Sequence, residues 1–350
     1  MKITGCRVDA VEVNFEGVMP GRHITLRLET DEGLTGLAYV SRVTPANMRA
    51  LSLLVDAMVG RVTGDDPTMV EAIHKKLYSS FLGAPLTGLE LRAASAVDVA
   101  CWDLAGKARD LPVWKLAGGY RRRVPISANW NLMPGPKDKI AKHLEDVIAR
   151  GFRAVKAPCG LAPLEAAIEH VRFIRECVGP DIRIIVDGNF QWGTRDAIRF
   201  ARETEDLDLF WIEDPVASHD YEAMRQVTDA VSQRTCAGEV FQHKHEFARL
   251  LEGRCSDYVM IDQDLGLTGF LKVAHMAEAY GRQVVNHLAP EALSQGIAAV
   301  PNGLIVGLVP WGQPLFTEQM RIEDGDLVLP DTPGLGLEFD ENVLTKCAMQ

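Results

Sequence analysis

The chain has 350 residues, of which 47% are hydrophobic and 24% charged, so it resembles an ordinary globular protein with a sizeable core. Its 48 acidic and 37 basic residues give a net charge of −11 at pH 7. This excess of acid argues against nucleic acid or an anionic membrane as the main partner, but not against a small anionic substrate.

The cysteines and the first residues indicate a reducing compartment. Seven cysteines are scattered without any CxxC pair, which is typical of reduced core thiols. The opening residues, MKITGCRVDAVEV, alternate like a strand and carry charges, unlike a signal peptide. No apolar run approaches the ~20 residues needed to span a membrane. We therefore expect a cytoplasmic protein.

The first part of the chain has the pattern of an α+β domain. The stretch HITLRLETDEGLTGLAYV (23–40) predicts a hairpin whose turn is Thr-Asp-Glu-Gly. Helical apolar spacing follows from about Pro45 to Leu82 and from Leu89 to Arg109. Strands followed by helices favour a separate α+β layer, so we expect a capping domain over residues 1–122.

From about Val124 short apolar runs alternate with amphipathic helical stretches. Eight such runs occur: VPISANW, FRAVKAP, IRIIVDGN, LFWIEDP, RTCAGE, DYVMID, QVVNH and LIVGLV. They predict a parallel barrel over residues 123–315. After the last run the chain is rich in proline and glycine and shows no clear eighth helix. We expect the tail, about 316–350, to pack against the first domain. The predicted fold is α/β: a modified (β/α)7β TIM barrel with an N-terminal α+β capping domain.

Three acidic residues end successive runs at equal spacing. Glu213 follows Asp187 by 26 residues, and Glu239 follows Glu213 by 26. One strand–helix unit has about that length, so the three carboxylates should lie together at the C-terminal rim, where barrel enzymes keep their sites. Carboxylates that close stay ionised only around a cation, and oxygen ligands favour Mg²⁺, with Mn²⁺ second. The alternative is three unrelated acids that pair with local arginine or lysine.

Two further strand ends are polar. Asp262 ends YVMID and His287 ends QVVNH. An Asp–His contact would orient the ring and raise its basicity, as a general base requires, although a lone histidine is more often a core residue. Asp264 is an alternative partner. The run FRAVKAP places Lys156 at the end of the second strand, where it should face His287 across the metal site; the alternative is a salt bridge to Asp187 alone.

These residues resemble the enolase superfamily, specifically its mandelate racemase-like subgroup. The stretch AASAVDVACWDLAGKARDLPVWKLAGG (93–119) is similar to the signature helix of that family, and LETDEGLTGLAYV (28–40) to its N-terminal hairpin. The Asp–Glu–Glu series is similar to its metal ligands, and the Asp–His pair to its catalytic dyad. The resemblance covers nearly the whole chain, and it implies that Asn189 lies near the substrate.

The sequence departs from the family pattern in two places. The usual Lys-x-Lys of the second strand is here Lys156-Ala157-Pro158, so the second lysine base is absent. Gly307 stands where the racemase has a glutamate that binds the substrate carboxylate. The loop after Asp262 is also shorter than the family pattern. We therefore do not expect racemisation of mandelate.

The resemblance implies abstraction of the proton α to a carboxylate, with Mg²⁺ at the three acids. A free lysine has a pKa about 3.4 units above pH 7, whereas histidine titrates near neutrality, so we assign His287 as the base and Lys156 as a cation. One good base favours elimination, and we expect a lyase that dehydrates a sugar acid to a 2-keto-3-deoxy acid. The alternatives are a racemase or epimerase of a 2-hydroxy acid, and a metal-binding family member that has lost catalysis.

Substrate contacts are expected from the first domain, which in this family covers the barrel mouth. The loop FEGVMPGRH (15–23) should lie over the substrate, where Arg22 and His23 could meet its hydroxyls; surface exposure of both is the alternative. The expected partners are a small carboxylate substrate and further copies of the chain in a homo-oligomer.

Overall fold

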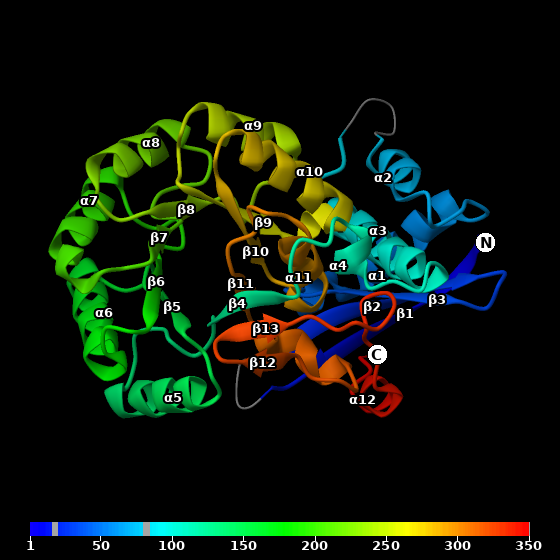
Figure 1. Ribbon diagram of the computed structural model, residues 1–350, viewed down its shortest axis with the longest axis horizontal. Coiled ribbons are helices and arrows are strands. Elements are labelled where there is room, and N and C mark those ends of the chain that lie inside the picture. Colours follow the sequence, from blue (N-terminus) through cyan, green and yellow to red (C-terminus); the bar gives the residue numbers. More distant parts are fainter. Residues whose placement is uncertain (16–19, 80–84, 350) are drawn as a thin grey trace.

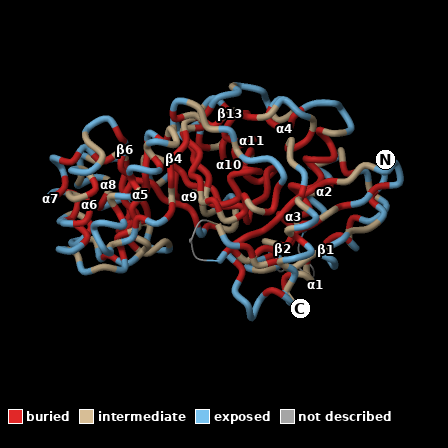
Figure 2. Tube along the Cα trace, turned by 90° about the horizontal axis from the view of Figure 1, so that it is seen from below, coloured by how far each residue is buried: buried red, intermediate tan, exposed pale blue. Residues whose placement is uncertain are grey.

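The computed structural model describes residues 1–15, 20–79 and 85–349, and it shows a barrel beside a smaller α+β cap (Figure 1). Buried residues run through both parts and through the region between them (Figure 2). Part of the loop expected to cover the substrate, 16–19, lies outside the described residues. A domain boundary at residues 122 and 123 stays a prediction.

The cap begins with an antiparallel sheet in the order β1-β2-β3, formed by Ile3–Val13, Gly21–Thr30 and Thr35–Val40. The hairpin over 23–40 is confirmed: Glu29 pairs with Thr35, and Gly33 takes a left-handed φ of 80° in the turn. The helical spacing predicted from about Pro45 to Leu82 is confirmed over most of its described part, with one interruption. Two helices form there, α1 (Pro45–Val62) and α2 (Val70–Tyr78). The TGDDP segment between them interrupts the helix, because Gly64 turns left-handed and Pro67 lacks an N–H.

Helix α3 (Gly88–Ala108) joins the two parts of the molecule, and the short α4 (Val113–Leu116) follows it. Almost every side chain from Leu91 to Gly106 is buried, because α3 packs against α1 and β3 on one side and against the barrel helix α10 on the other. Trp102 Nε1 donates to Thr268 Oγ1 of α10 at 2.8 Å, and Asp98 accepts from the Thr268 N–H at 2.9 Å. The signature stretch thus forms the junction between cap and barrel.

The barrel has eight strands with one α-helix in each of the seven connections, so the predicted (β/α)7β pattern is confirmed. The strands β4 to β10 run parallel in chain order, and β11 pairs with β4 to close the ring (Figure 1). The strands are Arg123–Ala128, Ala154–Pro158, Arg183–Asp187, Trp211–Glu213, Thr235–Ala237, Tyr258–Asp262, Gln283–His287 and Val306–Leu308. The helices α5 to α11 are Lys137–Ala149, Leu164–Val178, Thr194–Glu203, Tyr221–Ala230, Lys244–Glu252, Gly266–Ala279 and Pro290–Ala299. Short 3-10 turns lie at Glu205–Leu207 (η1), Gln263–Leu265 (η2) and, after β11, Pro310–Leu315 (η3).

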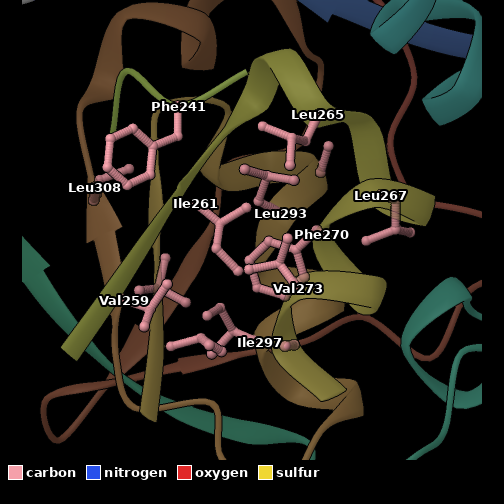
Figure 3. Packing of buried hydrophobic residues seen from close by; sticks show 14 of the residues in the cluster. Phe241, Val259, Ile261, Leu265, Leu267, Phe270, Val273, Leu293, Ile297 and Leu308 are labelled. Carbon is pink, nitrogen blue, oxygen red and sulfur yellow. The ribbon is translucent and has the colours of Figure 1, made fainter. Parts of the chain in front are cut away.

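Apolar side chains pack between the barrel strands and the surrounding helices and fix the positions of the strands. Figure 3 shows Val259 and Ile261 of β9 meeting Phe270 of α10 and Ile297 of α11. Gly296 allows this approach, since a Cβ there would lie 2.6 Å from the Phe270 ring. None of the described helices is both long and apolar enough to cross a bilayer.

The tail contacts both parts of the molecule, whereas only cap contacts were predicted. Its hairpin, β12 (Arg321–Glu323) and β13 (Asp326–Val328), pairs antiparallel with β4 and extends the barrel sheet. Phe316 and Phe339 then stack at 5.2 Å between ring centroids and join an apolar cluster with Val11 of β1. After α12 (Glu341–Lys346), the Met349 N–H donates to Ala10 O at 2.8 Å.

Candidate active site

The site rests on one layer of apolar side chains inside the barrel. Ala154, Ile185, Trp211, Met260 and Val285 belong to this layer, together with Cys236 and Ile305. Side chains alternate along a strand, so the residue two positions later points to the same interior side. Those residues are Lys156, Asp187, Glu213, Asp262 and His287. The alternation thus places these five polar side chains directly above the apolar layer.

Asp187, Glu213 and Glu239 form a buried cluster whose ligand oxygens all lie within 4.8 Å of one another. Asp187 and Glu213 are paired residues of β6 and β7. Glu239 lies two residues beyond the end of β8, after Gly238, whose φ is 128°. A Cβ at Gly238 would lie 2.5 Å from Met260 O, so the close approach to β9 requires glycine there.

Lys156 and His287 contact the cluster from opposite sides. Lys156 Nζ lies 3.0 Å from Asp187 Oδ2 and 2.6 Å from Glu213 Oε1, so it does not pair with Asp187 alone. On the other side, His287 Nε2 lies 3.1 Å from Glu239 Oε2. Burial alone would lower the pKa of Lys156, but the charges of the three carboxylates raise it well above its ordinary value.

The cluster carries more negative charge than Lys156 neutralises. Burial raises the pKa of Glu213 to about 7; the Lys156 ammonium opposes this shift, while Asp187 and Glu239 add to it. Three carboxylates around one position are the donor set of a hard divalent cation. The residues therefore fit Mg²⁺, and they are not three unrelated acids with separate arginine or lysine partners.

His287 and Asp262 form the predicted pair. They are partners in the parallel ladder of β10 and β9, and Asp262 Oδ2 hydrogen-bonds His287 Nδ1. This leaves Nε2 facing the cluster and the pocket. Burial alone would lower the pKa of His287, but the charge of Glu239 and the hydrogen bond to Asp262 raise it above its ordinary value. Asp264 is not the partner: both its oxygens accept from Arg92 at 2.8 Å.

A cavity of about 670 Å³ opens above these residues. Its wall includes Lys156, Asp187, Glu239 and His287, and also Asn189. Asn189 adopts a left-handed φ of 47° and donates its N–H to Asp187 Oδ1 at 2.8 Å. It therefore orients the Asp187 carboxylate and also lines the pocket. Pro158 lines the same wall and has no ionisable atom.

Two predicted substrate contacts are placed elsewhere. His23 is fully buried and contacts Trp311 O through Nε2 at 2.9 Å, and burial lowers its pKa to about 4. Arg22 Nε pairs with Glu12 Oε2 at 2.6 Å. Neither residue lines the cavity, where Trp311 forms that part of the wall. We therefore leave Arg22 and His23 out of the substrate site: Arg22 is paired with Glu12 of β1, and His23 is buried against Trp311.

Sequence reasoning missed several pocket residues. Arg42 of the cap lines the cavity, and its Nη1 lies 3.9 Å from Glu239 Oε1. Asn129, directly after β4, and Lys139, in the first turn of α5, line it as well. A Cβ at Gly307 would lie 2.6 Å from Asn129 Nδ2, so the Asn129 amide occupies the space that a side chain at 307 would need. No motif marks these residues, because Arg42 and Asn129 lie in loops and Lys139 lies in the first turn of a helix.

Two family models together match most of the chain. The mandelate racemase / muconate lactonizing enzyme N-terminal domain matches residues 4–118, and the enolase C-terminal domain-like model matches residues 139–343. The chain belongs to the mandelate racemase/muconate lactonizing enzyme family of the enolase superfamily.

The following relatives match between 91% and 100% of the chain. The L-talarate/galactarate dehydratase of Salmonella typhimurium is 28% identical over 91% of this chain and 80% of its own length. The arabinonate dehydratase of Saccharolobus solfataricus is 25% identical over 96% and 93%. The crystal structure of L-talarate dehydratase from a Polaromonas species, complexed with Mg and L-glucarate, is 29% identical with a TM-score of 0.91 and covers 100% and 98%. A racemase from Streptomyces coelicolor with bound magnesium is 28% identical with a TM-score of 0.93, covering 99% and 100%.

Proposed function

We propose that this family member is a Mg²⁺-dependent lyase that dehydrates a sugar acid to a 2-keto-3-deoxy acid. The observation that carries this proposal is the asymmetry of the rim. One side offers a histidine oriented by Asp262, whereas the other offers a lysine held cationic by two carboxylates and, in place of a second base, Pro158. Mg²⁺ bound at Asp187, Glu213 and Glu239 would supply Lewis acidity toward the substrate carboxylate.

His287 is the proposed general base and general acid. Its Nε2 takes the proton from C2, and Asp262 stabilises the resulting imidazolium through Nδ1. The electron pair of the broken C–H bond forms the C2–C3 double bond as the C3–O bond breaks. The imidazolium returns its proton to the departing hydroxyl, which leaves as water. The remaining enol becomes the 2-keto-3-deoxy acid.

Lys156 has an electrostatic role in this proposal. Its raised pKa keeps the ammonium charged, so it can offset the charge that develops on the substrate carboxylate but cannot accept a proton. Proton transfer then passes through one face of the substrate. Cys159 is not a substitute base, because its thiol is buried and burial raises its pKa far above neutrality.

The test is turnover of a library of acid sugars with Mg²⁺ in D₂O. We expect a 2-keto-3-deoxy acid that carries deuterium at C3, and recovered substrate that keeps its configuration at C2. Accumulation of the C2 epimer faster than any keto acid would favour a racemase instead. Absence of both products across the library, with Mg²⁺ bound, would favour a member without catalysis.

His287→Asn tests the assigned base. Asparagine keeps a polar side chain of similar reach but cannot accept the proton, so kcat should fall by at least about 1,000-fold. Circular dichroism and Mg²⁺ affinity should stay close to those of the wild type. Near-normal kcat in this variant would place the base elsewhere.

A further inference from the structure

The cap forms hydrogen bonds to two adjacent residues, Gln263 and Asp264, in the turn that follows β9. The Ser41 N–H and hydroxyl donate to Gln263 Oε1 at 3.2 and 3.4 Å, and Gln263 Nε2 donates back to Ser41 O at 3.2 Å. Both side chains are buried. Next to this contact, Arg92 of α3 donates from Nε and Nη2 to the two oxygens of Asp264, each at 2.8 Å. We call Ser41, Arg42 and Arg92, with Gln263 and Asp264, the cap clasp.

One end of the cap clasp reaches the catalytic dyad. The Asp264 N–H donates to Asp262 Oδ1 at 2.8 Å, which leaves Oδ2 for His287 Nδ1. The Asp262 carboxylate is therefore held by the backbone of the turn on one oxygen and by the histidine on the other. A shift of this turn would rotate the carboxylate, and the imidazole with it.

The other end of the cap clasp reaches the pocket. Arg92 Nη1 donates to Arg42 O at 3.1 Å. Arg42 has a φ of 60°, a left-handed conformation that is strained for a non-glycine residue and needs support from its surroundings. This backbone turns the half-exposed Arg42 side chain into the cavity wall, near Glu239. Arg92 thus contacts both the residue that presents a cation to the pocket and the turn that orients the base.

We propose that Arg92 is a positioning residue that couples the cap to the dyad through Asp264 and to the substrate pocket through the Arg42 carbonyl. Arg42 itself then binds the acid sugar, as a cation supplied by the cap. The inference deepens the proposed function, on which it rests for the roles of His287 and the pocket. The competing explanation is that Arg92 and Asp264 only stabilise the junction of cap and barrel.

Stability and positioning can be separated by changing both partners. Arg92→Met alone leaves the buried Asp264 carboxylate without its cation, which is costly. Replacing a buried ion pair by two apolar side chains is often neutral for stability. Arg92→Met/Asp264→Leu should therefore recover the melting temperature, but it still lacks the hydrogen bond to Arg42 and the tether on the turn.

The kinetic experiment uses the full-length Mg²⁺-loaded enzyme well below its melting temperature. For the double variant we expect kcat to fall and KM to rise, each by about tenfold, as a small misplacement of reacting groups would cause. Asp262→Asn should lower kcat alone, and Arg42→Ala should raise KM alone. The matched control is Arg61→Met, which removes another cap arginine that donates to the carbonyls of Lys76, Leu77 and Ser79. It should change stability without changing kcat or KM.

A second readout does not depend on turnover. The hydrogen-bonded Nδ1 proton of His287 should give a downfield proton NMR signal that His287→Asn removes. In the double variant this signal should shift or disappear, whereas Arg61→Met should leave it unchanged. Recovery of both stability and kcat in the double variant, or an unshifted signal, would overturn the proposal. If the wild type turns over no acid sugar, the proposed function fails, and the NMR comparison still decides whether Arg92 positions the dyad.

Discussion

The buried carboxylate of Glu213 has one hydrogen-bond partner on its own strand and one from a distant part of the chain. Glu213 is fully buried, and its two oxygens accept from Lys156 Nζ at 2.6 Å and from Trp211 Nε1 at 3.1 Å. A carboxylate in such a place is costly unless cations surround it, and this cost supports the assignment of the cluster as a metal site.

Glu213→Gln keeps the volume of the side chain but removes one of the three charges that would hold Mg²⁺. We expect the affinity for Mg²⁺ to fall by at least about 100-fold, and activity to be lost with it. Isothermal titration calorimetry measures the affinity. Asp206→Asn, which neutralises an exposed carboxylate paired with Arg172, is the control and should bind Mg²⁺ like the wild type. Equal affinity in both variants would mean that the ion is held elsewhere.

Gly307→Ala tests whether the Asn129 amide lies where the structure places it. The added methyl would meet Asn129 Nδ2 at 2.6 Å, whereas its next neighbour, Asn286 O, is at an ordinary 3.4 Å. The flexible amide should therefore rotate away, and KM should rise by roughly threefold to tenfold with little loss of stability.

A double-variant cycle gives this prediction its control. Once Asn129→Ala has removed the amide, adding Gly307→Ala should have no further effect on KM, because the two changes act on one group. Gly60→Ala adds the same methyl to α1 in open space and should leave KM unchanged. Additive effects of the changes at 129 and 307 would contradict the shared position.

Helix α11 of the barrel contacts the cap, in addition to the contacts between α3 and α10. It starts three residues after His287, through Leu288 and Ala289, whose φ angles are 57° and 37°. Its Glu291 is buried and accepts a hydrogen bond from the Tyr39 hydroxyl of β3. Burial raises the pKa of Glu291 to about 7, although the hydrogen bond from Tyr39 opposes the shift.

This pKa predicts a pH dependence of stability. The folded protein holds the Glu291 proton up to about pH 7, whereas the unfolded chain releases it near the ordinary glutamate pKa of 4.5. The protonated form therefore stabilises the fold fully below about pH 4.5, and this contribution is lost as pH rises through 7. Glu291→Gln should remove the effect, on the order of 3 kcal/mol, and flatten the profile. Urea unfolding between pH 5 and 8 measures it, and parallel profiles of the variant and wild type would refute the assignment.

In the whole molecule, the tail fastens the cap to the barrel. Its hairpin extends the barrel sheet at β4, while its aromatic residues pack on β1 of the cap. Phe339 is the centre of this contact, because it stacks on Phe316 and lies 5.0 Å below the Arg27 guanidinium. The cap and barrel are thus joined by α3, α11 and the tail.

Phe339→Ala should lower the free energy of unfolding by about 3–5 kcal/mol, since it removes a buried ring from a packed cluster. The control is Leu53→Ala on α1, where the side chain is 63% exposed and the loss should stay within about 0.5 kcal/mol. Chemical denaturation of both variants gives the comparison. A loss at position 339 no larger than at position 53 would show that the tail does not fasten the cap.

Local periodicity determined most of what the sequence predicted. Alternation within each strand and the 26-residue repeat placed Asp187, Glu213 and Glu239 on one rim, and the same reasoning paired β9 with β10. Such patterns are visible because one strand–helix unit is short and repeats. The sequence prediction did not place the break between α1 and α2, although the TGDDP segment carries both a glycine and a proline.

Tertiary packing alone decided the rest. Asp262 and Asp264 share a strand face in sequence, yet only Asp262 reaches His287, because Arg92 binds Asp264 from 172 residues away. His23 was expected over the substrate, but its strand lies inside the cap sheet. Arg42 enters the pocket through a left-handed turn that Arg92 supports. No periodicity encodes such contacts, since each depends on how the cap docks on the barrel, and that docking is settled by the burial of apolar surface along α3 and the tail.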